Sequence, residues 1–299
     1  MALYAFDGTW NRDKPGADTD TNVVWFKNAY VGHVFYREGV GTRFGVLGKV
    51  AGGITGAGGR SRVGDAMKAL RANLKKGDIV IDIIGFSRGA ALALHFANQV
   101  FKGKFDGFTP AAPPAIRFLG LWDCVPSFGV PTSPANVGWD LRLPDNVQKC
   151  YHALALDERR KSFALHRPEA RVDDASQEGR LFEVWFRGVH SDVGGGNRNH
   201  GLSSIALNWM FARAADCGVP LDATVVAQNR GRMNPAAKIS EKQKYDLVPN
   251  RFRVVRWNDH THESVAFRPD ADGREHNNPP NGLAVVADTG VVTGQFARA

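Results

Sequence analysis

The sequence lacks any apolar run long enough to cross a membrane. A transmembrane helix needs about 20 consecutive apolar residues, whereas aspartate or glycine interrupts the longest apolar stretches of this chain much sooner. The N-terminus enters strand-like sequence directly, without the basic segment and small-residue cleavage site of a secretory signal. We therefore expect no membrane-spanning segment and no export by the general secretory route.

Cysteine is also scarce. Cys124, Cys150 and Cys217 are an odd number, widely spaced and without a close pair. Such spacing predicts neither a disulfide framework nor a cysteine-based zinc site, and we expect no cofactor. The cysteine content is typical of a reducing compartment, so we expect a cytoplasmic location in the producing cell.

Massed charge of one sign is missing too. The formal net charge is +8, which favours anionic partners such as phospholipid headgroups. The basic residues are scattered, and the densest groups, at 159–161 and 251–253, are short enough to be solvated surface. We expect peripheral contact with an anionic membrane surface, with charge modifying affinity only. No nucleic-acid recognition motif is visible, so we expect no nucleic-acid partner.

The apolar residues, 43% of the chain, are grouped into short segments that end on reactive side chains. Four such segments, at 3–6, 79–84, 116–122 and 181–186, lead into Asp7, Ser87, Asp123 and His190. In an open parallel sheet the carboxyl ends of the strands lie along one edge, where ligands bind. Residues 1–299 are therefore predicted to form a single α/β domain with a mostly parallel sheet, helices on both faces and long loop insertions.

Helical patterns separate these segments. Apolar residues at helical spacing predict helices over 63–74, directly after Ser87, within 145–160, and after a cap at Ser203 or Ser204. Ten glycines in 39–64 predict an irregular loop or lid. Within it, 56–61 weakly resembles a phosphate-binding loop, but the required lysine is absent. The polar stretch 222–250 is predicted to be a cap or an insertion.

The most informative motif is Gly85-Phe86-Ser87-Arg88-Gly89, which has a strand-like run before it and a helical run after it. This is the context of a nucleophile elbow, a sharp turn that projects a serine hydroxyl toward a base. The glycines leave room for the turn and leave amide groups free to bind an oxyanion. A serine in an ordinary tight turn remains the alternative.

A catalytic serine needs a histidine base and a carboxylate that orients the histidine, and α/β-hydrolases supply them in the order Ser, acid, His. Ser87, Asp123 and His190 satisfy that order. The alternatives are a turn-capping role for Asp123 and a structural role for His190. Asp7 and Asp192 are rival acids, with Asp192 better suited to organising its loop, and His262 is the reserve base.

For the oxyanion we predict the backbone amide of Arg88 together with an amide at Gly8 or Thr9, in the loop after the first strand. Asp7, Thr9, Trp10 and Asn11 would line the same pocket, with pinning of that loop as the alternative role for Asp7. A metal site is the competing chemistry, from His190 with Asp192 or from His260 with His262. Neither pair has the spacing of a zinc helix.

Several blocks in fixed order resemble the α/β-hydrolase family that includes the first class of type VI secretion lipase effectors. The blocks are residues 6–11, 39–42, 77–90, 122–125, 152–160, 189–196 and 262–265. The resemblance assigns the serine, aspartate and histidine roles to Ser87, Asp123 and His190. It also implies a phospholipase active on bacterial membrane lipids, delivery by a specialised secretion system, and a secretion-system or immunity partner.

The sequence departs from the family in three ways. The chain is short, Cys124 stands where the family often has threonine, and Asn197 stands where an aromatic residue is frequent. These departures concern substrate and delivery rather than acyl chemistry. The sequence therefore predicts a serine ester hydrolase, a phospholipase or lipase. The alternative is a noncatalytic lipid- or partner-binding module on the same fold.

Overall fold

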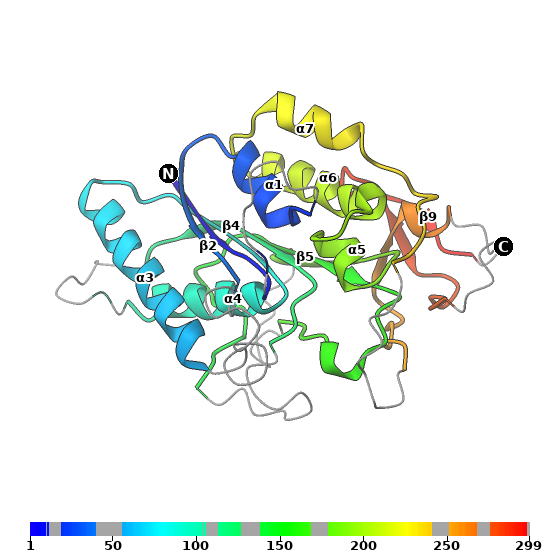
Figure 1. Cartoon of the computed structure of the whole chain (residues 1–299), viewed down its shortest axis with the longest axis horizontal. Helices are drawn as coiled ribbons and strands as arrows, with labels where there is room; N and C mark the ends of the chain where they lie inside the picture. The colour runs from blue at the N-terminus through cyan, green and yellow to red at the C-terminus, as the bar shows by residue number, and fades with distance from the viewer. Residues whose placement is uncertain are drawn as a thin grey trace.

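The computed structural model describes residues 1–9, 11, 19–39, 56–103, 105, 113–126, 138–168, 179–240, 251–267 and 276–297. Strands and helices alternate over the first half of the chain, and the last three strands follow three helices in succession (Figure 1). The elements are β1 (Ala2–Phe6), α1 (Asn22–Ala29), β2 (His33–Arg37), α3 (Gly56–Lys75), β3 (Ile81–Phe86), α4 (Arg88–Phe101), β4 (Ile116–Trp122), β5 (Cys150–Ala155), η1 (Lys161–Phe163), β6 (Leu181–Phe186), α5 (His190–Gly194), α6 (His200–Asp216), α7 (Ala223–Arg230), β7 (His260–His262), η3 (Glu263–Val265), β8 (Ala284–Val286) and β9 (Val292–Gln295).

In this part of the chain the strands form one nine-stranded sheet in the order β2-β1-β3-β4-β5-β6-β7-β8-β9. Neighbouring strands are parallel except for β9, which runs antiparallel to β8. This confirms the predicted fold class. The order reverses at β1, because β2 lies on one side of it and all later strands lie on the other. Connections therefore leave β1 and β3 in opposite directions, which in open α/β sheets opens the ligand-binding crevice.

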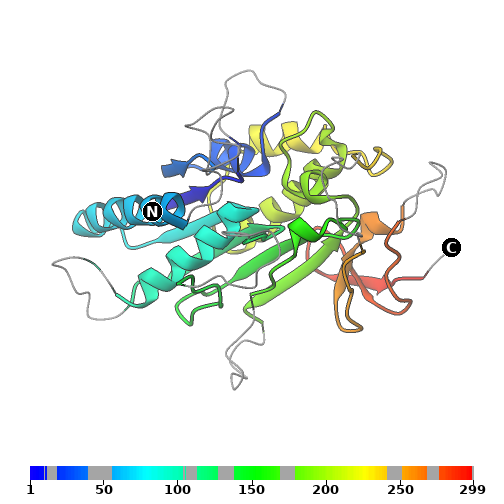
Figure 2. The same ribbon diagram turned by 60° about the horizontal axis from the view of Figure 1, so that its bottom comes forward.

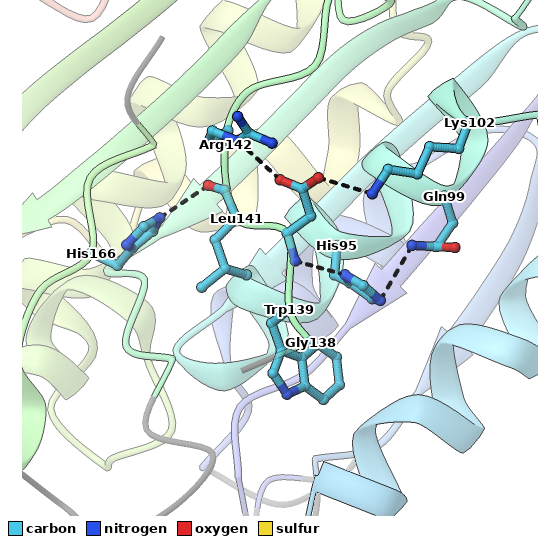
Figure 3. A pocket seen from close by; sticks show the side chains of 9 residues that line it. His95, Gln99, Lys102, Gly138, Trp139, Leu141, Arg142 and His166 are labelled. Atoms are coloured by element: carbon cyan, nitrogen blue, oxygen red, sulfur yellow. Dashed lines mark hydrogen bonds and ion pairs between the residues drawn. The ribbon is translucent and has the colours of Figure 1, made fainter. Parts of the chain in front are cut away.

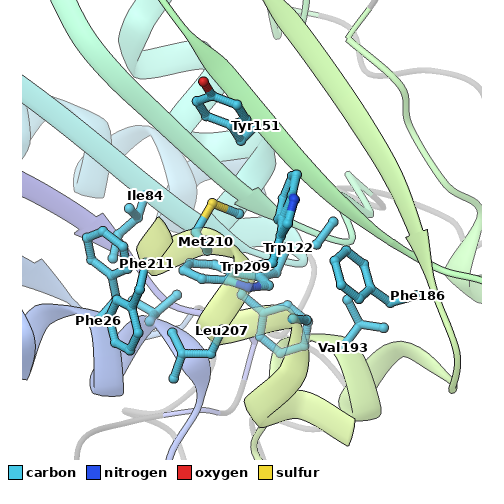
Figure 4. Close-up of a cluster of buried hydrophobic side chains, with 14 of the residues drawn as sticks. Phe26, Ile84, Trp122, Tyr151, Phe186, Val193, Leu207, Trp209, Met210 and Phe211 are labelled. Atoms are coloured by element: carbon cyan, nitrogen blue, oxygen red, sulfur yellow. The ribbon is translucent and has the colours of Figure 1, made fainter. Parts of the chain in front are cut away.

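Helices cover both faces of the sheet, as Figures 1 and 2 show. Strand β1 illustrates how the sequence achieves this, since successive side chains point to opposite faces. Leu3 and Ala5 join the core beneath α1, α5 and α6, whereas Tyr4 and Phe6 join the core against α3 and α4. Figure 4 shows the first core, in which aromatic side chains from α1, α6 and the strands pack together.

The predicted glycine-rich loop over 39–64 is partly wrong. Helix α3 begins at Gly56, so residues 56–64 are helical and the resemblance of 56–61 to a phosphate-binding loop has no structural basis. A side chain at Gly59 would approach the Trp139 ring to 2.8 Å, so close packing explains at least this glycine. The remainder of the predicted loop, 40–55, lies outside the described residues.

Residues 150–155 form strand β5 rather than the predicted helix. Every residue of β5 is buried, and Tyr151 and Leu154 belong to different cores. A strand buried on both faces is apolar throughout, so its pattern does not distinguish it from a buried helix.

Two further boundaries differ from prediction. Helix α6 begins at His200 with Asn199 as its N-cap, which places Ser203 and Ser204 inside the helix. The stretch 222–250 contains α7, whose first amides bond the Asp222 side chain, while 241–250 lies outside the described residues. No helix within the described ranges is both long and apolar enough to traverse a bilayer.

Candidate active site at the carboxyl edge of the sheet

Ser87 stands at a sharp turn between β3 and α4, as the motif predicts. Its backbone has φ 59° and ψ −125°, a region that costs a residue with a side chain on the order of 1–3 kcal/mol. Steric crowding explains why glycine flanks this turn on both sides. A Cβ on Gly85 would lie 2.5 Å from the Gly89 carbonyl oxygen, and one on Gly89 would lie 2.1 Å from that of Phe6. The strand–turn–helix context of a nucleophile elbow is confirmed.

Asp123 follows the neighbouring strand at the same level of the sheet. Phe86 pairs with Trp122 at the ends of β3 and β4, and the Ser87 amide donates to the Trp122 carbonyl at 3.0 Å. Asp123 is fully buried and has φ 42°. The sheet therefore brings the residues that follow β3 and β4 to one place.

His190 begins α5, just after β6, and its ring meets Asp123. The distance from Nδ1 of His190 to Oδ2 of Asp123 is 2.6 Å. The ring lies between Phe86 and Phe163, with centroid separations of 4.6 and 4.8 Å. Because Nδ1 faces the carboxylate, a neutral imidazole held this way presents Nε2 as a proton acceptor.

Arg253 is a component of the site that the sequence reasoning missed. Its Nη1 donates to Oδ1 of Asp123 at 2.5 Å and its Nη2 donates to Oδ2 at 3.0 Å. The same guanidinium donates to the carbonyls of Ala155 and Phe163. The expectation that 251–253 is solvated surface is therefore wrong for Arg253, whose side chain is 9% exposed. The two partners are 130 residues apart, and no local pattern links them.

These contacts determine the charge of Asp123. Burial alone would raise its pKa, but the positive charge of Arg253 and the hydrogen bond from His190 outweigh burial and hold the pKa well below its usual range. Oδ1 also accepts from the Ala155 amide at 2.9 Å. The carboxylate is thus ionised and fixed from several directions.

A second polar chain, also unpredicted, fixes the backbone just after Asp123. The Cys124 amide donates to Nε2 of buried His152 at 3.1 Å, and Nδ1 of His152 lies 2.9 Å from Oε1 of Glu183. Since Nε2 accepts, Nδ1 is the donor. Arg167 in turn donates to Oε2 of Glu183 at 2.6 Å.

Asp7 holds the loop that follows β1. Its carboxylate accepts from the Gly8 amide at 2.7 Å, from the Thr21 hydroxyl at 2.9 Å and from the Tyr36 hydroxyl at 2.8 Å. Burial raises the pKa of Asp7 to about 6, despite these hydrogen bonds. The contacts match the alternative in which Asp7 pins its loop, and none of them joins it to His190.

Two of the predicted oxyanion donors, Gly8 and Thr9, belong to this loop. The Gly8 amide donates to Asp7, so of the predicted pair Gly8 or Thr9 the Gly8 amide already has a partner. The Thr9 hydroxyl accepts from Nη1 of Arg88 at 2.8 Å, which ties the loop to the elbow. The Asn11 amide bonds the Gly8 carbonyl, and Trp10 lies outside the described residues.

Asp192, a rival acid, organises its own loop as predicted. It accepts from the Val189 amide, from the amide and hydroxyl of Ser240, and from Asn197. His190 and Asp192 therefore have separate partners, which argues against the metal site built on this pair.

His262, the reserve base, lies at the end of β7 with other partners. Its Nδ1 is 2.9 Å from the Ser264 hydroxyl, its Nε2 is 3.1 Å from Asp288, and its ring stacks on Phe186. Its neighbour His260 is exposed. Asp123 therefore contacts His190, whereas His262 contacts Ser264 and Asp288.

A mostly parallel sheet with a serine elbow and a strand-end Asp–His pair defines a protein of the α/β-hydrolase type. The sequence model described as "T6SS, Phospholipase effector Tle1-like, catalytic domain" matches residues 3–103 and 95–213. The chain therefore belongs to the Tle1-like phospholipase effector family, and the resemblance in the sequence is confirmed. No curated protein matches the chain.

A comparison with solved structures supports the fold through the first of the two described here. An uncharacterized protein from Pseudomonas aeruginosa aligns with a TM-score of 0.54 and 24% identity, over 74% of this chain and 46% of that chain. The Tle1 effector bound to the VgrG spike from the type 6 secretion system gives a TM-score of 0.47 and 24% identity, over 66% of this chain and 51% of that chain. This chain spans about half the length of these structures.

Proposed function

We propose that this protein is a serine-dependent ester hydrolase that cleaves acyl esters of lipids, as a phospholipase or lipase. The observation that carries the proposal is the 2.6 Å contact between His190 and Asp123, at the sheet edge where Ser87 occupies its strained elbow. Membership of a phospholipase effector family supports the lipid substrate.

In the proposed reaction the Ser87 hydroxyl attacks the ester carbonyl carbon and gives its proton to Nε2 of His190. Asp123 orients the imidazole and stabilises the imidazolium that forms. The amides of Arg88 and Thr9 bind the oxyanion of the tetrahedral intermediate. His190 then protonates the alcohol as its bond to the acyl carbon breaks, which leaves the acyl group on Ser87 Oγ. Water gives a proton to His190 and attacks that acyl carbon, and His190 returns the proton to Ser87 Oγ as the fatty acid leaves.

Replacing Ser87 by alanine tests this proposal. We expect hydrolysis of phospholipid and of short-chain esters to fall by roughly three orders of magnitude or more, because only oxyanion and binding effects remain. Mass spectrometry of a lipid extract after incubation with each protein measures the products. Unchanged hydrolysis by a folded Ser87→Ala variant would refute the assignment.

A fluorophosphonate probe separates the enzyme from a noncatalytic module on the same fold. Covalent labelling needs an activated serine, so we expect modification at Ser87 near neutral pH and none in the Ser87→Ala variant. A wild-type chain that resists the probe and releases no fatty acid would favour the binding module.

We further propose delivery by a type VI secretion system. Membership of an effector family supports this delivery. Release of the protein from a producing strain, compared with a strain whose secretion apparatus is disabled, tests it, and equal release from both strains would contradict it.

A further inference from the structure

Glu158 is a buried carboxylate beside the base, and the proposed reaction gives it no role. It lies just beyond the end of β5, at the same edge of the sheet as Asp123 and His190. Its side chain is 1% exposed. The amide of His190 donates to Oε2 of Glu158 at 3.2 Å, whereas Asp123 meets the ring. Two carboxylates therefore contact the same histidine at different groups.

Arg160 pairs with the Glu158 carboxylate. Its Nη2 donates to Oε2 at 2.7 Å and its Nε donates to Oε1 at 2.9 Å. Oε1 also accepts from the amides of Arg159 and Arg160, at 3.0 and 2.8 Å. Burial alone would raise the pKa of Glu158, but the hydrogen bonds and charge of Arg160, and to a smaller degree the charge of His190, lower it. The carboxylate is thus ionised.

The same guanidinium holds one of the two rings that flank His190. Its Cζ lies 3.5 Å from the centroid of the Phe163 ring, within the range of a cation–π contact. Phe163 meets the His190 ring edge-on, with the centroids 4.8 Å apart. The expectation that 159–161 is solvated surface is wrong for Arg160, whose side chain is 11% exposed. Arg160 thus links the acid that bonds the His190 amide to the ring that packs against its imidazole.

His95 provides a contrast. It lines a cavity of about 520 Å³ with Asp140, whose carboxylate pairs with Lys102 and Arg142 (Figure 3). Nδ1 of His95 accepts from the Asp140 amide at 3.1 Å, so this nitrogen does not donate to a carboxylate. Burial lowers the pKa of His95 to about 4. A base that gains a proton during a reaction needs acidic groups against it, and His190 has one on its ring and one on its amide.

We propose that Glu158 is a positioning residue for the base of the proposed reaction. It fixes the backbone of His190, and through Arg160 it also supports Phe163, which packs against the imidazole. Its negative charge favours the imidazolium that forms when Ser87 gives up its proton. The inference rests on the proposed function for the identity of the base, and it deepens that function by adding an ion pair to the site.

Glu158→Gln removes the charge and keeps the shape of the side chain. An amide has one acceptor oxygen, and three donors meet Oε1 against two at Oε2, so its NH2 group should face the His190 amide. We expect kcat for a soluble ester to fall on the order of tenfold, with KM within about twofold of wild type. The low-pH limb of kcat/KM should move down by about half a pH unit, because the imidazolium loses a neighbouring negative charge.

The direction of this movement identifies the charge that causes it. The charged groups packed around His190 in the described part of the chain are Asp123, Arg253, Glu158, Arg160 and, on its own helix, Asp192. Glu158→Gln leaves the charge of Arg160 without its anion, which adds to the downward movement. Glu158→Asp keeps the negative charge and should return the limb to its wild-type position. A limb that stays in place in Glu158→Gln, or that moves equally in Glu158→Asp, would overturn the proposal.

Asp157→Asn is the matched control. Asp157 is a buried acid that pairs with Arg187 at 3.0 Å and accepts from the Gly188 amide at 2.7 Å. Its other contacts in the described structure are with residues 276 and 277. Both variants should lower the midpoint of urea unfolding, but Asp157→Asn should keep the limb at the wild-type pH. Equal movement of the limb in the two variants would overturn the proposal, since loosening of the segment would then explain it.

Phe163→Leu tests the same support without removing a buried charge, and it applies even where Glu158→Gln does not fold. Phe163 is half-buried, so the change should be tolerated. We expect kcat to fall by about three- to tenfold with the limb in place, because ring packing is lost and charge is not. A kcat equal to that of the wild-type chain would refute the support of His190 through Phe163.

Nuclear magnetic resonance titration of the nine histidines separates this inference from the proposed function, because it requires no turnover. The signal that is absent from a His190→Gln variant identifies His190. Its titration midpoint should be lower in Glu158→Gln than in the wild-type chain and unchanged in Asp157→Asn. That result in a chain without ester hydrolysis would support the contact and refute the catalytic assignment. An unchanged midpoint in a folded, active Glu158→Gln chain would overturn the positioning role alone.

Discussion

The ends of β1 and β4 each carry a buried aspartate, and the two carboxyl groups are in opposite electrostatic situations. Asp7 is 2% exposed and Asp123 is fully buried. Asp7 has only neutral hydrogen-bond donors around it, an amide and two hydroxyls, and burial raises its pKa to about 6. Asp123 meets a guanidinium and an imidazole, and its pKa is lowered despite equally complete burial.

The difference shows that burial does not decide which strand-end acid is suited to orient a base. An ionised carboxylate stabilises an imidazolium, and only the acid with cationic partners is ionised at little cost. Asp7 instead uses its oxygens to hold a loop, a task for which the neutral and the charged form both serve. The contrast therefore supports the proposed catalytic role of Asp123 at the end of β4, and it supports a scaffolding role for Asp7 at the end of β1.

The largest expected effect comes from exchanging each acid for its amide. Asp123→Asn should lower kcat by about 10³–10⁴-fold, because an amide opposite Nδ1 favours the wrong imidazole tautomer. Asp7→Asn should keep activity within about tenfold of wild type, since its contacts are with a loop. Steady-state hydrolysis of a soluble ester measures kcat for both variants. Equal losses of kcat would contradict the different roles given to Asp7 and Asp123.

The scaffolding role of the β1 end predicts a large stability effect at Gly89. Gly89→Ala places a Cβ 2.1 Å from the Phe6 carbonyl oxygen, so backbone must move, and we expect a loss of about 3 kcal/mol in the free energy of unfolding. Gly64→Ala, in α3 with no atom within 4 Å of the added Cβ, should gain about 0.5–1 kcal/mol. Urea unfolding compares them, and a Gly89→Ala chain as stable as Gly64→Ala would contradict this account of the elbow.

Removing the Arg253 guanidinium should raise the pKa of Asp123, because this carboxyl group then loses its cationic partner, as Asp7 has none among its hydrogen-bond donors. In Arg253→Gln the low-pH limb of the kcat/KM profile should move up by about one pH unit, because the coupled Asp123–His190 pair binds its proton more tightly without a neighbouring positive charge. Activity at the optimum should fall on the order of tenfold. Arg253→Lys retains the charge and should restore the position of the limb.

Exposed Arg251, in the same segment, provides the control. Arg251→Gln should leave the low-pH limb where it is in the wild-type chain. A limb that stays in place in Arg253→Gln as well would show that the guanidinium has only a packing role.

The smallest effect concerns the pH dependence of stability. The folded pKa of Asp7 is about 6, above its ordinary value of 3.8, so the folded state binds more protons between those values. The contribution of Asp7 to the free energy of unfolding is therefore greatest at low pH, and it is lost as the pH rises through about 6. Relative to Asp7→Asn, wild type should lose on the order of 1–3 kcal/mol between about pH 4 and about pH 7. Parallel stability curves from urea unfolding would show that Asp7 does not titrate in this range.

The sequence predicts those parts of the fold and site that depend on local pattern. Ser87, Asp123 and His190 were each identified because a short apolar strand precedes a polar residue, and parallel strands collect their ends at one edge. Strand β5 was misread because a strand buried on both faces has no period that distinguishes it from a helix. The start of α3 was missed because its glycines argue against a helix, yet Gly59 packs where a larger residue would strike Trp139.

Long-range partners could not be predicted from one sequence. Arg253 and Asp123 meet only after the chain has folded, and nothing near position 253 marks it as different from neighbouring arginines. His152 was included in block 152–160 of the family resemblance but was given no role, because its contacts to Cys124 and Glu183 come from neighbouring strands. Such contacts depend on strand order, which the pattern of apolar residues does not specify.

The guanidinium on Asp123 comes from beyond the stretch that the family model matches, which ends at residue 213. A fragment cut at that boundary would retain Ser87, Asp123 and His190, yet the Asp123 carboxylate would be buried without the guanidinium that neutralises it. Anyone trimming this chain to a minimal unit should therefore keep the last third of the polypeptide, although the family model does not match it.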